Sequence, residues 1–134
     1  MKRFHVSVGV TDLEASVAFY ARLFDAEPTL KKADYARWVL DEPSVNFSIN
    51  LSSAETGVSH LGVQADNAAE LQEVFDRFAR TEGSVLDEGE TTCCYARSTK
   101  QWVSDPDGLS WEGFQTHLED VERPQTTPSP YGCC

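Results

Sequence analysis

Two histidines at matching positions of an internal repeat are the first residues here that could carry chemistry. The segment His60–Ala65 aligns with the segment His5–Val10 at an offset of 60 minus 5, or 55 residues, so that both segments begin with histidine. Apolar and polar residues alternate in the first segment, which predicts a strand with His5 turned away from its apolar face. Two such histidines would converge where two repeated modules meet.

A carboxylate on a later segment completes a set of metal ligands. Glu112 shares one face of an expected strand with Ser110 and Phe114. Taken alone, the glutamate would be read as a solvated surface residue, and each histidine as structural. Together, two histidines and one carboxylate leave coordination positions open and suit Fe(II), Mn(II) or a related divalent ion; with Fe(II) this is the oxygenase arrangement. We therefore predict that His5, His60 and Glu112 bind a metal.

Two pairs of adjacent cysteines form a second group, Cys93 with Cys94 and Cys133 with Cys134. We expect thiols in a chain without an export signal, and neighbouring thiolates suit thiophilic ions. Adjacent strand residues point to opposite faces, so the first pair can chelate one atom only in a loop or bulge, which is expected after Gly89. The alternative for this pair is two small hydrophobic residues packed at a strand edge.

The surrounding pattern predicts one α+β domain built from two copies of a βαβββ module. Each expected helix begins with capping-box spacing, from Thr11 to Glu14 and from Asn67 to Glu70. The modules span about 1–54 and 55–116. The expected strands cover about 4–10, 27–32, 35–40, 45–51, 60–65, 84–89, 95–104 and 109–116, and the first helix about 12–24.

Composition excludes several kinds of partner. The chain has 11 basic and 22 acidic residues, a formal net charge of -11, which repels nucleic acid and anionic membranes. No apolar run approaches the roughly 20 residues of a membrane helix, and the first residues lead into a strand, so we expect a cytoplasmic protein. Residues 117–134 are acidic and then rich in Pro, Thr and Ser, which predicts a flexible tail. His117 is expected to lie in solvent.

Over about residues 1–116 the sequence resembles the vicinal oxygen chelate superfamily, which includes glyoxalases, bleomycin resistance proteins and dioxygenases. The duplicated module carries the resemblance, as does the turn Asp105-Pro106-Asp107-Gly108 that precedes Leu109-Ser110-Trp111-Glu112. It implies two modules forming a cupped mixed sheet, without choosing a reaction. A glyoxalase-like protein would usually offer a fourth ligand from the last strand of the first module, where Ser48, Ile49 and Asn50 supply no carboxylate.

Cys93 and Cys94, with the three metal-ligand candidates, resemble the carbon-arsenic bond lyases and the related cadmium-induced proteins. The resemblance implies that the cysteines bind a trivalent methyl- or aryl-arsenical, that His5, His60 and Glu112 bind Fe(II), and that dioxygen is the co-substrate. A non-catalytic cadmium- or arsenic-binding resistance protein and a Mn-dependent fosfomycin-type thiol transferase remain alternatives. So does a metal-free drug-binding module. The sequence leaves open whether the modules meet within one chain or across a homodimer.

Overall fold

One eight-stranded sheet runs through both halves of the chain, in the order β2-β3-β4-β1-β5-β8-β7-β6. The computed structural model describes residues 1–122. Its elements are β1 (Arg3–Val10), α1 (Leu13–Phe24), β2 (Leu30–Lys31), β3 (Tyr35–Asp41), β4 (Ser44–Leu51), β5 (Gly57–Ala65), α2 (Ala68–Arg80), β6 (Val85–Cys93), β7 (Ala96–Ser104) and β8 (Ser110–Glu119). Each half therefore contributes a strand, a helix and three further strands, which confirms the predicted α+β repeat.

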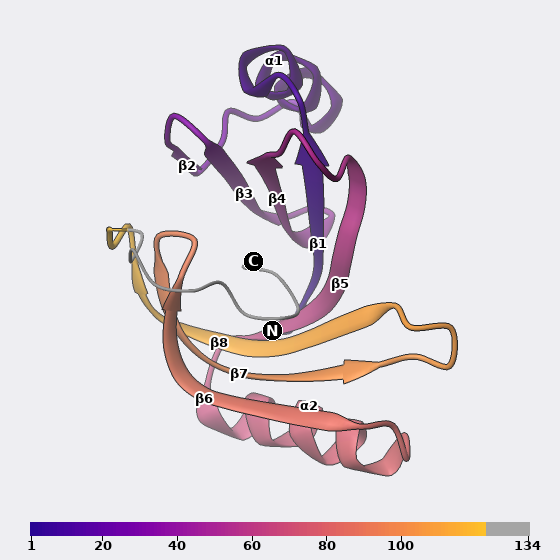
Figure 1. The fold of residues 1–134 in the computed structure, drawn as a ribbon. Coiled ribbons are helices and arrows are strands. Elements are labelled where there is room, and N and C mark those ends of the chain that lie inside the picture. Colours follow the sequence, from indigo (N-terminus) through magenta and orange to yellow (C-terminus); the bar gives the residue numbers. More distant parts are fainter. Residues whose placement is uncertain (123–134) are drawn as a thin grey trace.

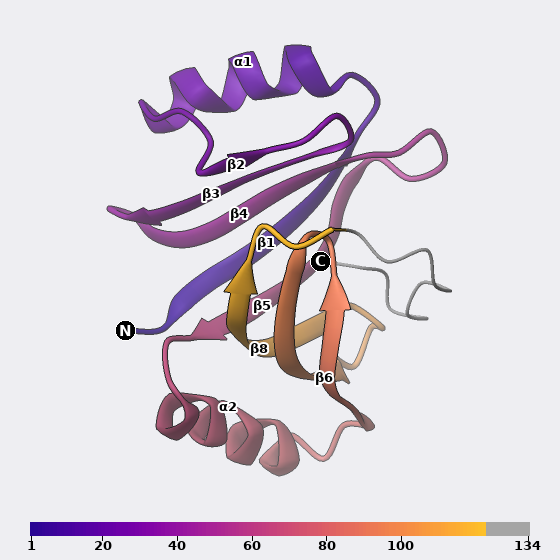
Figure 2. The same cartoon turned by 90° about the vertical axis from the view of Figure 1, so that its left-hand side faces the viewer.

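The two halves join through their first strands. β1 pairs with β5 in antiparallel orientation, while β4 lies parallel to β1 and β8 lies parallel to β5. The sheet is therefore mixed, and each half places its last strand beside its first. Figure 1 shows the sheet curled into a cup, with α1 and α2 on the outer sides of the two halves; the turned view in Figure 2 shows the same layers.

Helix packing decides which side chains face the inside of the cup. On the α1 side, Trp38, Phe47 and Ile49 belong to one buried apolar cluster, and on the α2 side Val74 and Phe78 pack with Val103. Because side chains alternate along a strand, the intervening positions point to the other face. Those positions supply the buried polar and charged residues His5, Ser7, Arg37, Asn46, Ser48, His60, Gln64, Ser98, Lys100 and Glu112.

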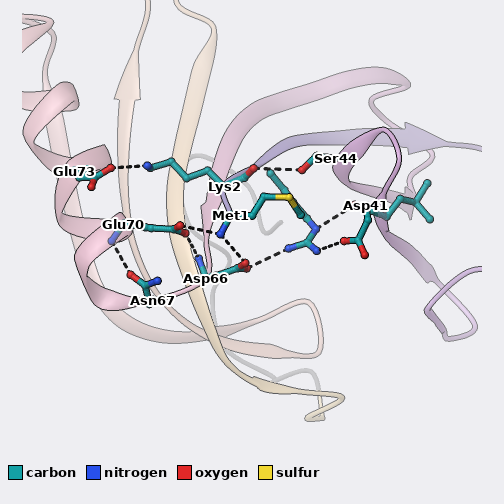
Figure 3. Close-up of polar contacts among 10 residues, drawn as sticks. Met1, Lys2, Asp41, Ser44, Asp66, Asn67, Glu70 and Glu73 are labelled. Atoms are coloured by element: carbon teal, nitrogen blue, oxygen red, sulfur yellow. Dashed lines mark hydrogen bonds and ion pairs between the residues drawn. The ribbon is translucent and has the colours of Figure 1, made fainter.

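The beginning of β1 is fixed between the two halves by ion pairs (Figure 3). Lys2 Nζ lies 2.5 Å from a carboxylate oxygen of Glu73 on α2. Arg3 pairs with Asp66 at 3.1 Å and with Asp41 at 2.5 Å, so one guanidinium connects the end of β3 to the residues before α2. This network holds the strand that carries His5 against both modules.

Several predicted boundaries differ from those of the structure. β2 contains only Leu30–Lys31, β6 continues to Cys93 instead of ending near residue 89, and β8 continues to Glu119. The cap of α1 is Asp12, whose side chain accepts a hydrogen bond from the amide of Ala15 at 3.0 Å, and not Thr11.

The predicted flexible tail mostly lies beyond the described residues. Residues 123–134, with Cys133 and Cys134, fall outside them, so both the domain boundary and the tail stay predictions. In the part of the chain that the structure describes, neither helix has the length and apolar character required to cross a membrane.

Candidate metal centre and cysteine hairpin

The two histidines of the repeat meet inside the cup. His5 on β1 and His60 on β5 are 3% and 0% exposed, and their Nε2 atoms are 3.2 Å apart. The Nδ1 atom of His5 lies 3.0 Å from the carbonyl oxygen of Asn46. A carbonyl can only accept, so Nδ1 carries the proton and Nε2 is left with a lone pair directed into the cup. This partner fixes the orientation that a ligating imidazole needs.

Glu112 on β8 is the third member of the cluster. Its Oε2 atom lies 3.2 Å from His60 Nε2, and its Oε1 atom lies 3.3 Å from Nζ of the buried Lys100. One ligand atom from each of His5, His60 and Glu112 lies within 4.8 Å of the other two, the one such group found among residues 1–122. All three residues come from one chain in this structure.

Strand register explains why His5 and Glu112 converge. His5 pairs with Gly62 across β1 and β5, and Gly62 pairs with Glu112 across β5 and β8. His5 and Glu112 are thus two strands apart, with a residue between them that has no side chain. A Cβ atom on Gly62 would stand 2.4 Å from the carbonyl oxygen of Glu112. The glycine therefore allows the close approach of β8 on which the cluster depends.

The cluster has the composition and spacing of a divalent-metal site. Ligands about 2.1 Å from one ion and at right angles to each other lie about 3 Å apart, close to the two 3.2 Å separations here. Glu112 Oε2 is fully buried without a hydrogen bond, which in a protein interior calls for an explanation. A cation between the imidazoles and this oxygen would supply the missing partner. The residues present therefore fit Fe(II) or a similar ion.

Burial and charge keep His5 and Glu112 in the protonation states that metal ligation requires. Burial lowers the pKa of His5 to about 4, an effect that Glu112 opposes and His60 reinforces. Burial acts to raise the pKa of Glu112, but Lys100 and the two histidines together bring it below its ordinary value. At neutral pH the site therefore presents a neutral His5 imidazole and an ionised carboxylate.

The cysteine pair lies at the tip of the β6–β7 hairpin. Cys93 ends β6, and Cys94 and Tyr95 form a two-residue turn with φ angles of 45° and 67°. Two positive φ angles define a type I′ turn, which normally uses Asn and Gly, so Cys94 and Tyr95 are unusual in it. The predicted loop is thus a tight turn. Because Cys94 lies in this turn, it leaves the alternating strand pattern, as two adjacent cysteines must if both are to bind one atom.

The hairpin docks on the first module beside the metal centre. Tyr95 Oη donates a hydrogen bond to Asp34 at 2.6 Å, and Cys94 Sγ lies 3.7 Å from Asn50 Oδ1 on β4. A cavity of about 20 Å³, enough for roughly one water molecule, lies between the hairpin and the sheet. It is lined by His5, Tyr35, Arg37, Asn46, Cys93, Cys94, Ala96, Ser98, Lys100, Glu112, Phe114 and Thr116.

The expectation that Cys93 and Cys94 are thiols differs from the structure. Both are disulfide-bonded, and residues 1–122 contain no free cysteine. A disulfide sulfur has no proton to lose and is no longer a thiolate ligand. Any role in binding a soft ion therefore belongs to the reduced protein.

No sequence pattern distinguished Arg37 or Lys100, although both line the small cavity beside the cysteine hairpin, and Lys100 could be read equally as a pocket residue or as an ordinary alternating strand residue. Lys100 is 4% exposed and Arg37 is 5% exposed. Both residues occupy strand positions that face the inside of the cup. Because Lys and Arg are rarely buried without a partner, a basic residue at such a position could have indicated a functional site. His117 lies outside the cluster, with Nε2 2.7 Å from Thr99 Oγ1 at an exposed position, as expected.

A larger cavity, of about 640 Å³, lies elsewhere, between the end of α2 and the β7–β8 turn. Phe78, Val103 and Trp111 make part of its wall. It contains none of the candidate ligands or cysteines, so its size does not make it the reactive site.

The fold and the buried cluster are those of a known protein superfamily. Residues 2–112 match the Glyoxalase/Bleomycin resistance protein/Dioxygenase superfamily, and the chain belongs to it. Among its relatives, the trivalent organoarsenical cleaving enzyme of Bacillus sp. (strain MD1) is 43% identical, over 100% of this chain and 83% of the relative. The cadmium-induced protein CadI of Mycobacterium bovis is 37% identical, over 91% of this chain and 80% of the relative.

Solved structures show the same vicinal oxygen chelate fold. The Mn(II)-bound glyoxalase from Novosphingobium aromaticivorans superposes with a TM-score of 0.62 at 20% identity, over 95% of this chain and 44% of that one. Homoprotocatechuate 2,3-dioxygenase from Arthrobacter globiformis superposes with a TM-score of 0.62 at 20% identity, over 89% of this chain and 37% of that one. At this identity the likeness establishes the fold alone.

Proposed function

We propose that this protein is an Fe(II)-dependent dioxygenase that cleaves the carbon-arsenic bond of trivalent organoarsenicals, releasing arsenite. The observation that carries the proposal is the shared cavity: Cys93 and Cys94 line it together with His5 and Glu112. Thiolates bind trivalent arsenic, whereas two histidines and a carboxylate suit Fe(II), so one cavity holds residues for both. The names of relatives that are 37% to 43% identical support the same reading.

His5, His60 and Glu112 would hold the iron, and bound Fe(II) supplies the activation of dioxygen. The protein's own contribution is positioning. The carbonyl of Asn46 keeps the Nε2 lone pair of His5 directed inward, and Lys100 restrains one oxygen of Glu112. Holding the arsenical at two sulfurs beside the metal would turn an encounter between separate molecules into a reaction between oriented groups.

Cys93 and Cys94 bind arsenic as thiolates, each giving up its proton as the arsenic-sulfur bond forms. For the methyl substrate the overall reaction balances as CH3As(OH)2 + O2 → As(OH)3 + HCHO. The carbon-arsenic bond breaks, the carbon is oxidised to formaldehyde, and both oxygen atoms of O2 end in the products. The two cysteines must first be reduced, since both are disulfide-bonded in the structure.

A second candidate is a sequestering protein that binds cadmium or arsenic without turnover. The relationship to CadI favours it. It would use the same cysteines but consume no oxygen, so oxygen uptake in the presence of an arsenical separates the two functions. The Mn-dependent thiol transferase alternative assigns no role to the cysteine hairpin.

Cysteine variants test the proposed division of labour. In reduced protein loaded anaerobically with Fe(II), Cys93→Ser/Cys94→Ser should retain iron and lose release of arsenite from methylarsonous acid. The matched control is Cys133→Ser/Cys134→Ser, which removes the other adjacent pair and should keep turnover. Normal turnover in the first double variant would remove the assigned role of the hairpin.

A further inference from the structure

Arg37 on β3 is a buried cation that the proposed reaction does not use. The residue is 5% exposed, and its side chain lines the cavity that both cysteines also line. It forms an ion pair through Nη2 with Glu119, a carboxylate that is 55% exposed, and Nη1 lies 3.5 Å from the hydroxyl of Tyr35. The Nε atom is fully buried and has no hydrogen-bond partner. An unsatisfied donor of a buried guanidinium is costly, which suggests that a ligand completes it.

Strand register places Arg37 between the arsenic-binding hairpin and the metal centre. Along the inner face of β3, Tyr35 pairs with Asn50, the residue beside Cys94 Sγ. Val39 pairs with Asn46, whose carbonyl accepts from His5.

Arg37 occupies the position between those two rows, paired with Ser48. Each row is about 7 Å from the next along the strand. An arsenical bound at Cys94 whose organic group extends toward His5 would pass Arg37, and the cavity, which holds about one water molecule in this structure, must widen to admit it.

The chemistry of arsenic ligation indicates which part of the substrate would meet this cation. Two thiolates replace both hydroxyl groups of a trivalent RAs(OH)2, so the complex has no oxygen left on arsenic. An acceptor for Arg37 must then belong to the organic group. A methyl group offers no acceptor. The para substituent of a phenyl group lies about 7 Å from arsenic, which is the spacing between the row of Cys94 and the row of Arg37. A carboxylate there could accept two hydrogen bonds from the planar guanidinium.

We propose that Arg37 is a specificity residue that binds an anionic substituent on the ring of an arylarsenical. The inference rests on the proposed function, because it assumes that the cysteines hold arsenic. Glu119 is the resting partner of the guanidinium, and its exposure lets it turn to solvent when a substrate carboxylate arrives. The preferred organic group is then an acidic aryl group in place of methyl.

Anaerobic binding tests the inference without relying on turnover. We would titrate reduced, Fe(II)-loaded protein with phenylarsonous acid and with 4-carboxyphenylarsonous acid by isothermal calorimetry. The carboxylated ligand should bind on the order of tenfold more tightly. Arg37→Gln should abolish that preference, and Arg37→Lys should restore only part of it because lysine lacks the planar fork. Glu119→Gln, the matched control, breaks the ion pair but keeps the cation, and should preserve or increase the preference.

Three outcomes would overturn the inference. Equal affinities in the wild type would do so while leaving the proposed function standing, and this comparison needs no variant to fold. An equal loss of preference in Arg37→Gln and Glu119→Gln would show that the ion pair only connects β3 to β8. Failure of the wild type to bind either arsenical would remove both the inference and the proposed arsenic-binding role of the hairpin.

Discussion

Gly62 stands directly opposite Glu112 in the β5–β8 ladder, at a position where a methyl group would come within 2.4 Å of the glutamate's carbonyl oxygen. Gly62→Ala should therefore push β8 away and separate the three ligands. We expect at least a tenfold loss of divalent-metal affinity and about 1–3 kcal/mol of lost stability. Anaerobic metal titration and urea unfolding measure the two effects.

Gly83→Ala provides the control for that substitution. A Cβ at Gly83 would stand 2.8 Å from Cγ2 of Val103, a comparable crowding in a region without the metal ligands. It should reduce stability while leaving metal affinity unchanged. A Gly62→Ala protein that binds metal as tightly as wild type would contradict the role assigned to the glycine.

Lys100→Met should destabilise the metal-free protein far more than the metal-bound one. Without metal, removal of Lys100 leaves the buried Glu112 carboxylate without the ammonium group that now lies 3.3 Å from it, at a cost of about 3–5 kcal/mol. A bound Mn(II) ion would neutralise the same charge. The gain in Tm on adding Mn(II) should consequently be larger in the variant than in the wild type.

Lys31→Met is the surface comparison for Lys100→Met. Lys31 is 40% exposed and pairs with the exposed Glu14, so its loss should change stability by less than about 1 kcal/mol with or without metal. Equal gains in Tm for wild type and Lys100→Met would show that Lys100 does not balance the charge of Glu112.

The stability of the metal-free protein should fall as the pH drops from about 6.5 to about 4. Burial lowers the folded-state pKa of His5 from 6.5 to about 4, so in this window the unfolded chain takes up a proton that the folded chain does not. At the acid end of this window, His5 should lower the free energy of unfolding by on the order of 3 kcal/mol. Urea unfolding at a series of pH values measures it, and His5→Gln should flatten the dependence. An unchanged slope in the variant would assign the effect to other groups.

Tyr95→Phe should loosen the cysteine hairpin. The substitution removes the 2.6 Å hydrogen bond to Asp34 while preserving the ring that packs 5.7 Å from the ring of Tyr35. In reduced protein, we expect alkylation of Cys94, which is 0% exposed, to become several-fold faster because local opening becomes easier. Peptide mass spectrometry follows the reaction, with Tyr20→Phe as the control. An identical rate in Tyr95→Phe would mean that this bond does not restrain the hairpin.

Local sequence patterns were sufficient for the repeated order of strands and helices and for bringing the cluster together, whereas the cupped mixed sheet was expected only from the resemblance to the superfamily. The repeat placed His5 and His60 at equivalent positions, and alternation on β1 and β8 directed His5 and Glu112 to the inner face. These features depend on residues close together in the chain, where side-chain period and secondary structure are directly linked.

Other features depend on pairing between strands that are distant in the sequence, so local sequence patterns could not predict them. The space at Gly62 follows from its register with both β1 and β8, and the contact of Lys100 with Glu112 follows from the β7–β8 hairpin. The burial of Arg37 requires the second module to fold over β3. The end of β6 at Cys93 was missed because Gly89 suggested a loop, whereas the strand continues through a register shift there.

The most direct test of the central claim is the yield of both products from one substrate. Reduced protein, loaded anaerobically with Fe(II), would be mixed with methylarsonous acid and oxygen, and arsenite and formaldehyde would be quantified over several turnovers. We expect the two in equal amounts, more than one of each per protein, and neither without iron or oxygen. Stoichiometric binding of the arsenical with no product would contradict the claim and establish a sequestering protein instead.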